Sequence, residues 1–189
     1  MVFSTPYFLF LYLPAVLLLY YISPLKLRNF VLLVFNLLFY GWGEPVYILL
    51  MILSVLVNWL AGRWIGSARK GARLPMVLAV VFNLALLGVF KYSGFLMETL
   101  GAVTGLALPV PRISLPIGIS FFTFQAMSYL IDLYRGDVPV QKSLVAFGTY
   151  VSLFPQLIAG PIVRYETVEQ EIRERQVTMD DLAQGFRRF

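Results

Sequence analysis

Long apolar runs separated by short polar breaks dominate the first half of the chain. They lie at about Pro6–Ile22, Asn29–Tyr40, Val46–Ala61 and Pro75–Phe90. Runs of this kind, almost without charge, predict helices embedded in a bilayer. The first run could instead be a signal peptide. However, no Lys or Arg precedes it and no small-x-small site follows it, so we predict a retained helix, bent at Pro14.

The pattern becomes irregular beyond the fourth run. Ser93–Pro111 predicts a short helix and a loop near the membrane interface. Leu115–Tyr134 is long enough to span a bilayer but opens with Pro116, and Ser143–Pro161 is interrupted by Pro155. Irregular backbone at membrane depth persists only where protein or a water-filled cavity surrounds it. We therefore expect a site in these two segments rather than in the first four.

Basic residues predict the orientation. The segment Gly62–Leu74 carries four Lys or Arg and no acid, which is typical of a cytoplasmic loop. Counting back through the runs puts the Lys26/Arg28 turn inside, the Trp42–Glu44 turn outside and the N-terminus in the periplasm.

The composition changes abruptly near Arg164. Residues 1–162 are predicted to form a transmembrane region of four to six membrane-embedded helices, some of them broken or re-entrant. Residues 163–189 are predicted to form an amphipathic helix at the cytoplasmic surface, followed by the start of a truncated next helix capped near Thr178. The fold class is therefore all-α and polytopic, and the chain resembles a piece of a longer protein.

Composition narrows the possible chemistry. The 189 residues are 59% hydrophobic and only 13% charged, whereas soluble domains are about 45–50% apolar and about 25% charged. His and Cys are both absent, which excludes a zinc site, a Cys–His pair and a Ser–His–Asp triad within this chain. We expect no metal and no bound cofactor. The net charge of +5 lies in short loops, so the expected partner is a lipid bilayer and not nucleic acid.

Several polar residues lie inside the apolar runs. Asn36, Asn58 and Asn83 could line a path, but hydrogen bonds between helices are the better explanation because no charge accompanies them. Lys91, at the end of the fourth run, is expected to extend toward the headgroups.

Asp132 and Arg135 are three residues apart and could form an interfacial ion pair. Alternatively, Asp132 and Gln125, which share one helix face with Ser128 or Tyr129, could line a polar tunnel.

The segment Phe154–Pro161 contains two prolines, a glycine and a glutamine within an apolar stretch. It marks either a helix end at a substrate channel or a simple kink. The candidate path residues are accordingly Gln125, Asp132, Pro155, Gln156, Gly160 and Pro161.

Several of these segments resemble the membrane-bound O-acyltransferases of bacteria. The strongest matches are LPIGISFFTFQAMSYLIDLYRG at Leu115–Gly136 and FPQLIAGPIVRY at Phe154–Tyr165. Weaker matches are the opening Met1–Ser4, Phe39–Trp42, Asn58–Trp59 and Phe90–Tyr92. The likeness is greatest to the branch that acetylates alginate and related polysaccharides, and it covers nearly the whole chain.

The resemblance implies a helical ring with a thin centre and a transfer of acetyl groups. The donor would be acetyl-CoA or a carrier-linked acyl group in the cytoplasm. The acceptor would be an exopolysaccharide, and periplasmic acetyltransferase partners would complete the transfer. The family's catalytic histidine lies on a later helix of a longer chain, so no catalytic residue can be assigned here, and this piece is expected to be inactive alone in the bacterial inner membrane.

Alternatives stay open at this point. Within the same family, the acceptor could be teichoic acid receiving D-alanine. Outside it, the chain could be a small transporter, which broken helices at Pro116 and Pro155 would suit. It could also be a non-enzymatic membrane scaffold.

The hydrophobic pattern makes a direct prediction about solubility. Because lipid is expected to surround most of the apolar side chains, the purified chain should need detergent to stay monodisperse. Size-exclusion chromatography with and without detergent checks this. A soluble, monodisperse polypeptide in plain buffer would contradict the membrane assignment.

Overall fold

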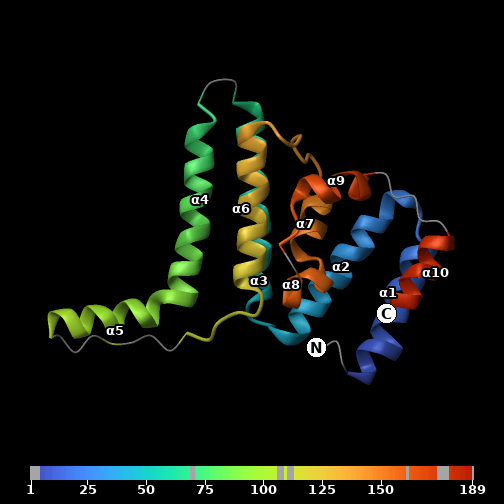
Figure 1. Ribbon diagram of the computed structural model, residues 1–189, viewed down its shortest axis with the longest axis horizontal. Coiled ribbons are helices and arrows are strands. Elements are labelled where there is room, and N and C mark those ends of the chain that lie inside the picture. Colours follow the sequence, from blue (N-terminus) through green and yellow to red (C-terminus); the bar gives the residue numbers. More distant parts are fainter. Residues whose placement is uncertain are drawn as a thin grey trace.

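The computed structural model describes residues 5–68, 71–105, 109, 113–160, 162–173 and 179–188. Every regular element in these residues is a helix, which confirms the all-α prediction (Figure 1). In order, the elements are the π-helical turn η1 (Phe8–Tyr12), α1 (Leu13–Ile22), α2 (Leu25–Gly43), α3 (Ile48–Ser67), α4 (Arg73–Leu87), the π-helical turn η2 (Gly88–Tyr92), α5 (Ser93–Thr104), α6 (Ile119–Arg135), α7 (Leu144–Ser152), α8 (Phe154–Ala159), α9 (Tyr165–Arg173) and α10 (Met179–Arg188).

Pro14 accounts for the irregular start of the first apolar helix. Its ring nitrogen cannot donate to the carbonyl four residues earlier. The turn just before it, η1, is wound as a π-helix, after which α1 continues with Pro14 in its first turn. The irregularity predicted at Pro14 is thus a change of helix winding.

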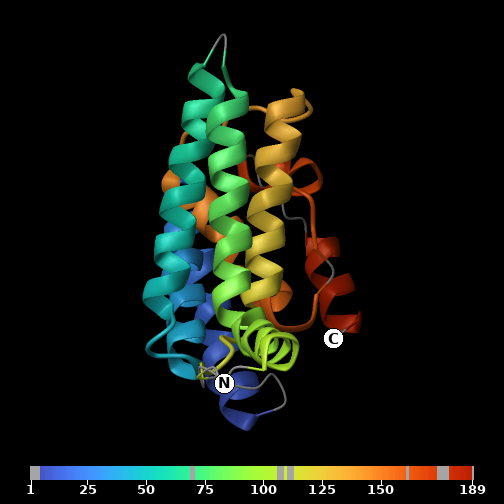
Figure 2. The ribbon, with the colours of Figure 1, turned by 90° about the vertical axis from the view of Figure 1, so that its left-hand side faces the viewer.

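Helices α3, α4 and α6 stand side by side (Figure 2). A Cβ added to Gly62 would lie 2.9 Å from Cε1 of Tyr129 on α6, and one added to Gly66 would overlap Val140. Small residues one turn apart let helix backbones approach closely in this way. The prediction of a loop at Gly62–Leu74 is therefore wrong for Gly62–Ser67, because α3 continues to Ser67 and makes this contact.

Asparagines join the helices inside the bundle. Nδ2 of Asn83 on α4 donates to Oδ1 of Asn58 on α3 at 2.6 Å, and the reverse bond measures 3.2 Å. Asn36 on α2 accepts from the backbone N–H of Phe154 at 3.3 Å. All three asparagines are fully buried, and the interpretation as hydrogen bonds between helices is confirmed.

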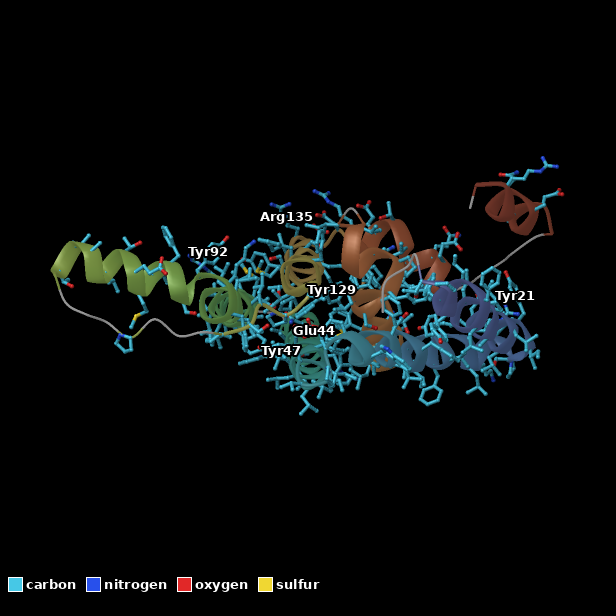
Figure 3. The ribbon with its side chains drawn as sticks, turned by 90° about the horizontal axis from the view of Figure 1, so that it is seen from below. Tyr21, Glu44, Tyr47, Tyr92, Tyr129 and Arg135 are labelled. Atoms are coloured by element: carbon cyan, nitrogen blue, oxygen red, sulfur yellow. The ribbon has the colours of Figure 1, made fainter. Side chains whose placement is uncertain are left out.

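The chain turns sharply at η2, and α5 leaves the bundle, as the view from below shows (Figure 3). A short helix after Phe90 was predicted, and α5 is that helix. Lys91 in η2 is exposed, and its Nζ lies 3.3 Å from Oγ of Ser120 at the start of α6. Its location at the headgroups stays a prediction.

The distribution of side chains is the reverse of that in a water-soluble protein. Asn58 and Asn83 are completely buried, whereas Leu49 is 71% exposed and Leu60 57% exposed. Within the described residues, three helices are long and apolar enough to cross a membrane: α2, α3 and the continuous stretch Arg73–Thr104. Phe8–Ile22 is apolar but shorter, and α6 has 17 residues, so the predicted number of spans stays a prediction.

The basic ends of the helices gather at one end of the bundle. Close contacts join Gly66 at the end of α3 to Val140, Gln141 to Tyr165, and Asn29 near the start of α2 to Ile172. The segments around Lys26, Arg63 and Arg164 therefore share one end, as the predicted topology requires. Which side of a membrane this end faces stays a prediction.

Two helices, α9 and α10, follow Arg164, and the amphipathic surface helix expected here stays a prediction. In α9, Tyr165 and Ile172 are buried and Glu166 is exposed. α10 begins at Met179, directly after Thr178, which lies outside the described residues. The location of these helices on a membrane surface and the thin-centred ring stay predictions.

The asparagine pair gives a test of the α3–α4 contact. Asn58→Leu removes both bonds and leaves the Asn83 amide buried, so we expect the unfolding free energy to fall by about 0.6–2 kcal/mol. The double variant Asn58→Leu/Asn83→Leu should lose less than the sum of the two single variants, because no polar group is then left unpaired. Thermal unfolding in detergent measures both. Strictly additive losses would show that the pair is not coupled.

Candidate functional site

The candidate site lies where α7 breaks into α8. Leu153 adopts an extended backbone (φ −56°, ψ 109°), and α8 restarts at Phe154 with Pro155 in its first turn. Proline is well suited there because the first N–H groups of a helix have no intrahelical partner. The N–H of Phe154 is taken up by Asn36 of α2, so a neighbouring helix satisfies the broken backbone.

Gln125 connects α6 to both sides of this break. Its Nε2 donates to the carbonyl of Tyr150 on α7 at 2.9 Å and to Oε1 of Gln156 on α8 at 3.3 Å. Gln125 is 3% exposed, so these bonds form away from water. The structure thus brings together two of the predicted path residues, Gln125 and Gln156.

The segment from α7 to α9 leaves one end of the bundle and returns to it. At its two ends, Nε2 of Gln141 donates to the Tyr165 hydroxyl at 2.7 Å. In its middle, Leu157 meets Gly118 at the opposite end of α6, where an added Cβ would lie 2.8 Å from the Leu157 carbonyl oxygen. Gly118 has φ +76°, which favours glycine, and the close approach leaves no room for a side chain.

Aromatic rings pack together where the segment from α7 to α9 returns to this end of the bundle. Tyr165 packs edge-on against Tyr129 and Tyr150, with ring centroids 5.0 and 5.2 Å apart. Phe147 packs against Tyr129 at 5.1 Å. The Tyr150 hydroxyl donates to the carbonyl of Val163 at 2.9 Å. This bond joins the segment between α8 and α9 to α7. Such ring pairs add about 0.5–1.5 kcal/mol each beyond their buried area.

Burial keeps the Tyr165 hydroxyl, at the start of α9, neutral. Tyr165 is 1% exposed, and this burial raises the pKa of its hydroxyl to about 12. The group therefore stays protonated throughout the physiological range and can accept from Gln141 without bringing charge into the bundle.

Asp132 and Thr123 on α6 are buried, and each has a side-chain oxygen without a hydrogen-bond partner. Asp132 is 5% exposed, and its atom without a partner is Oδ2. The ion pair with Arg135 suggested by the sequence does not form: the salt bridge found in the described part of the chain joins Arg173 to Glu169, and the Arg135 side chain is exposed. Asp132 lies two turns beyond Gln125, so the two residues share one face of α6.

The remaining predicted residues lie around the break. Pro155 is exposed in the first turn of α8, and Gly160 is half-buried at the end of α8, where its N–H donates to the Gln156 carbonyl at 3.2 Å. Pro161 lies outside the described residues. Among the described residues, no group of acidic side chains could hold a metal ion.

Sequence reasoning did not single out two members of the network, Tyr150 and Gln141. Tyr150 supplies both a carbonyl to Gln125 and a hydroxyl to Val163. The available signal was a tyrosine in the middle of an apolar run, because a buried tyrosine hydroxyl usually needs a partner. Gln141 lies in the loop between α6 and α7, and no pattern in the sequence indicated that it would bridge two segments.

The site offers amide, hydroxyl and carboxyl groups but no nucleophile with an adjacent base. Its geometry suits the lining of a path, in which Gln125 fixes the position of a broken helix and Asp132 provides an unpaired acceptor. Amide, hydroxyl and carboxyl groups of this kind can orient a polar substrate.

Comparisons with known proteins identify the relatives of this chain. No family model matches it, and no solved structure matches it. Over its whole length it is 41% identical to the probable alginate O-acetylase of Azotobacter vinelandii and 40% identical to that of Pseudomonas putida. It is 28% identical over 93% of its length to the peptidoglycan O-acetyltransferase of Helicobacter pylori.

The chain spans about two fifths of the length of these relatives, 39% of the Azotobacter protein and 40% of the Pseudomonas putida protein. The expected resemblance is thus confirmed over the whole length of the chain. This similarity fits the alginate branch of the membrane-bound O-acyltransferases, which the sequence motifs resemble.

Proposed function

We propose that this chain forms part of an enzyme that O-acetylates an exopolysaccharide such as alginate. The observation that supports this function best is the identity of 36–41% to alginate O-acetylases across the entire chain. The relatives named above are called alginate or peptidoglycan acetylating enzymes, which favours a polysaccharide acceptor over D-alanyl transfer to teichoic acid. A transporter or a bare scaffold has no comparable support.

In this proposal the acetyl group comes from the cytoplasm, from acetyl-CoA or a carrier-linked donor. It passes the bundle and reaches the polysaccharide with the help of periplasmic acetyltransferase partners. The chain lies in the inner membrane of a bacterium, with its N-terminus in the periplasm, because the basic ends of α2, α3 and α6 then face the cytoplasm.

The proposed path runs along α6 beside the break between α7 and α8. Gln125 and Gln156 define its middle, Asp132 lies toward the basic end, and Pro155 and Gly160 shape the broken backbone. A part for Pro161 in the path stays a prediction. Segment 142–164 is re-entrant in this proposal, since both of its ends lie at the cytoplasmic end of the bundle. A polar face of this kind lets a polar group cross where hydrocarbon would exclude it.

A chimera tests the function. This chain would replace the matching two fifths of the Pseudomonas putida alginate O-acetylase, in cells lacking their own enzyme. We expect the chimera to restore acetyl groups on secreted alginate. The 189-residue chain expressed alone should restore none, because it has no histidine to act as general base. Acetylation by the chain alone, or none by a chimera that reaches the membrane, would contradict the proposal.

The glutamine bridge gives a sharper test within that chimera. Gln125→Leu removes two buried hydrogen bonds, each worth about 0.5–1.5 kcal/mol, and leaves the Gln156 amide oxygen without its donor. We expect lower alginate acetylation with normal membrane insertion. Acetyl content of the polymer and the amount of protein in the membrane fraction are the two measurements.

Gln170→Leu is the matched control. Gln170 is exposed on α9, outside the network, so the same change should leave acetylation unaltered. Equal acetate content in the two variants would remove Gln125 from the path.

A further inference from the structure

An apolar groove lies on the outer flank of the bundle, between the first helix and α2. Its volume is about 480 Å³. Tyr7, Leu11, Tyr12 and Ala15 form one wall, and the other consists of α2 side chains between Phe35 and Trp42. The groove is separate from the candidate site, because the rings of Tyr12 and Phe154 pack between them with centroids 5.6 Å apart.

The lining offers nothing to a polar ligand. The Tyr12 hydroxyl, in the wall of the groove, donates to the carbonyl of Phe35 at 2.7 Å, so this donor already has its hydrogen-bond partner inside the protein. Phe39, which lines the groove, packs against the ring of Phe8 with centroids 5.8 Å apart. A ligand held here would gain free energy from apolar contact alone, and a flexible alkyl chain can follow such an irregular surface.

The position of the groove indicates where that alkyl chain comes from. Both walls belong to apolar helices, the candidate span Leu25–Gly43 and the shorter Phe8–Ile22. The groove lies toward the end of α2 opposite Lys26, and its rim carries Trp42 and Tyr7, which are 75% and 74% exposed. Exposed Trp and Tyr at the end of an apolar helix are typical of the level of the lipid headgroups.

We propose that this groove binds one acyl chain of a phospholipid, from the membrane leaflet on the Trp42 side. The π-helical turn η1 contributes Leu11 and Tyr12 to the wall. The wider winding of a π turn sets the side chains apart from the regular helical pattern, as is common where a helix meets a ligand. The lipid is a resident ligand of the fold, independent of the acetyl path.

A filling substitution tests the site. Ala15→Phe places a ring in the groove, whereas Ala85→Phe makes the same change on an exposed apolar position of α4. The protein would be purified in mild detergent with added phosphatidylcholine and examined by native mass spectrometry. We expect the unchanged protein and Ala85→Phe to retain a phospholipid adduct, and Ala15→Phe to lose it. An adduct equally abundant in Ala15→Phe, or absent from the unchanged protein, would overturn the proposal.

A fluorescence experiment uses Trp42 on the rim as the reporter and leaves the groove unchanged in the variant that keeps it. The chain has three tryptophans, so a Trp42-only variant (Trp59→Phe/Trp64→Phe) can be compared with a Trp64-only variant (Trp42→Phe/Trp59→Phe). Phosphatidylcholine with brominated acyl chains is titrated into the detergent-purified protein. Trp42 should lose most of its emission at stoichiometric lipid. Trp64, which is half-exposed near the C-terminal end of α3, should need an excess of lipid for the same loss. Parallel quenching of the two would show only non-specific lipid contact.

Discussion

A polar group in hydrocarbon must find its partner inside the protein, and this requirement organises the whole bundle. Water cannot satisfy a broken backbone or an amide side chain at membrane depth. The protein meets the requirement by turning its polar residues inward. Asn58 and Asn83 bond to each other across α3 and α4, and Asn36 accepts from the backbone N–H of Phe154. Leucines such as Leu49 and Leu60 cover the outside instead.

The same requirement explains why the break between α7 and α8 lies where it does. An interrupted helix needs several neighbours to complete its hydrogen bonds, and α2 and α6 supply them through Asn36 and Gln125. The irregular segment is therefore enclosed by protein, as its proline and glycine content required. Its return to the starting end is fixed by Tyr165, whose ring fills the space between Tyr129 and Tyr150.

Asp132 is the acidic residue among several buried side chains, Asn36 and Thr123 included, that have a polar atom without a partner in the described part of the chain. Its carboxylate is buried, yet Oδ2 has no partner among the described residues. A buried carboxylate oxygen without a partner is costly, and Asp132 lies on the same face of α6 as Gln125, two turns away, which favours a polar role for this face. The relatives are about two and a half times as long as this chain.

The sequence by itself determined the class of the protein and most of its elements. Hydrophobic runs without charge define membrane helices because composition and period alone decide whether lipid can surround them. The motifs at Leu115–Gly136 and Phe154–Tyr165 sufficed to indicate the family, and the prolines predicted the break at α8. Local backbone chemistry carries all of these inferences.

Only the tertiary structure decided which polar groups meet. The partner of Gln125 lies 31 residues away and that of Asn29 lies 143 residues away, and no local pattern specifies such pairs. Gly62 and Gly66 were predicted to lie in a basic loop, yet they are helical, and the lack of a side chain lets Tyr129 and Val140 approach α3 closely there. Asp132 and Arg135 had the spacing of an ion pair, but packing buries the first and leaves the second exposed. Spacing along one helix fixes which residues can share a face, whereas burial and pairing depend on what the neighbouring helices bring.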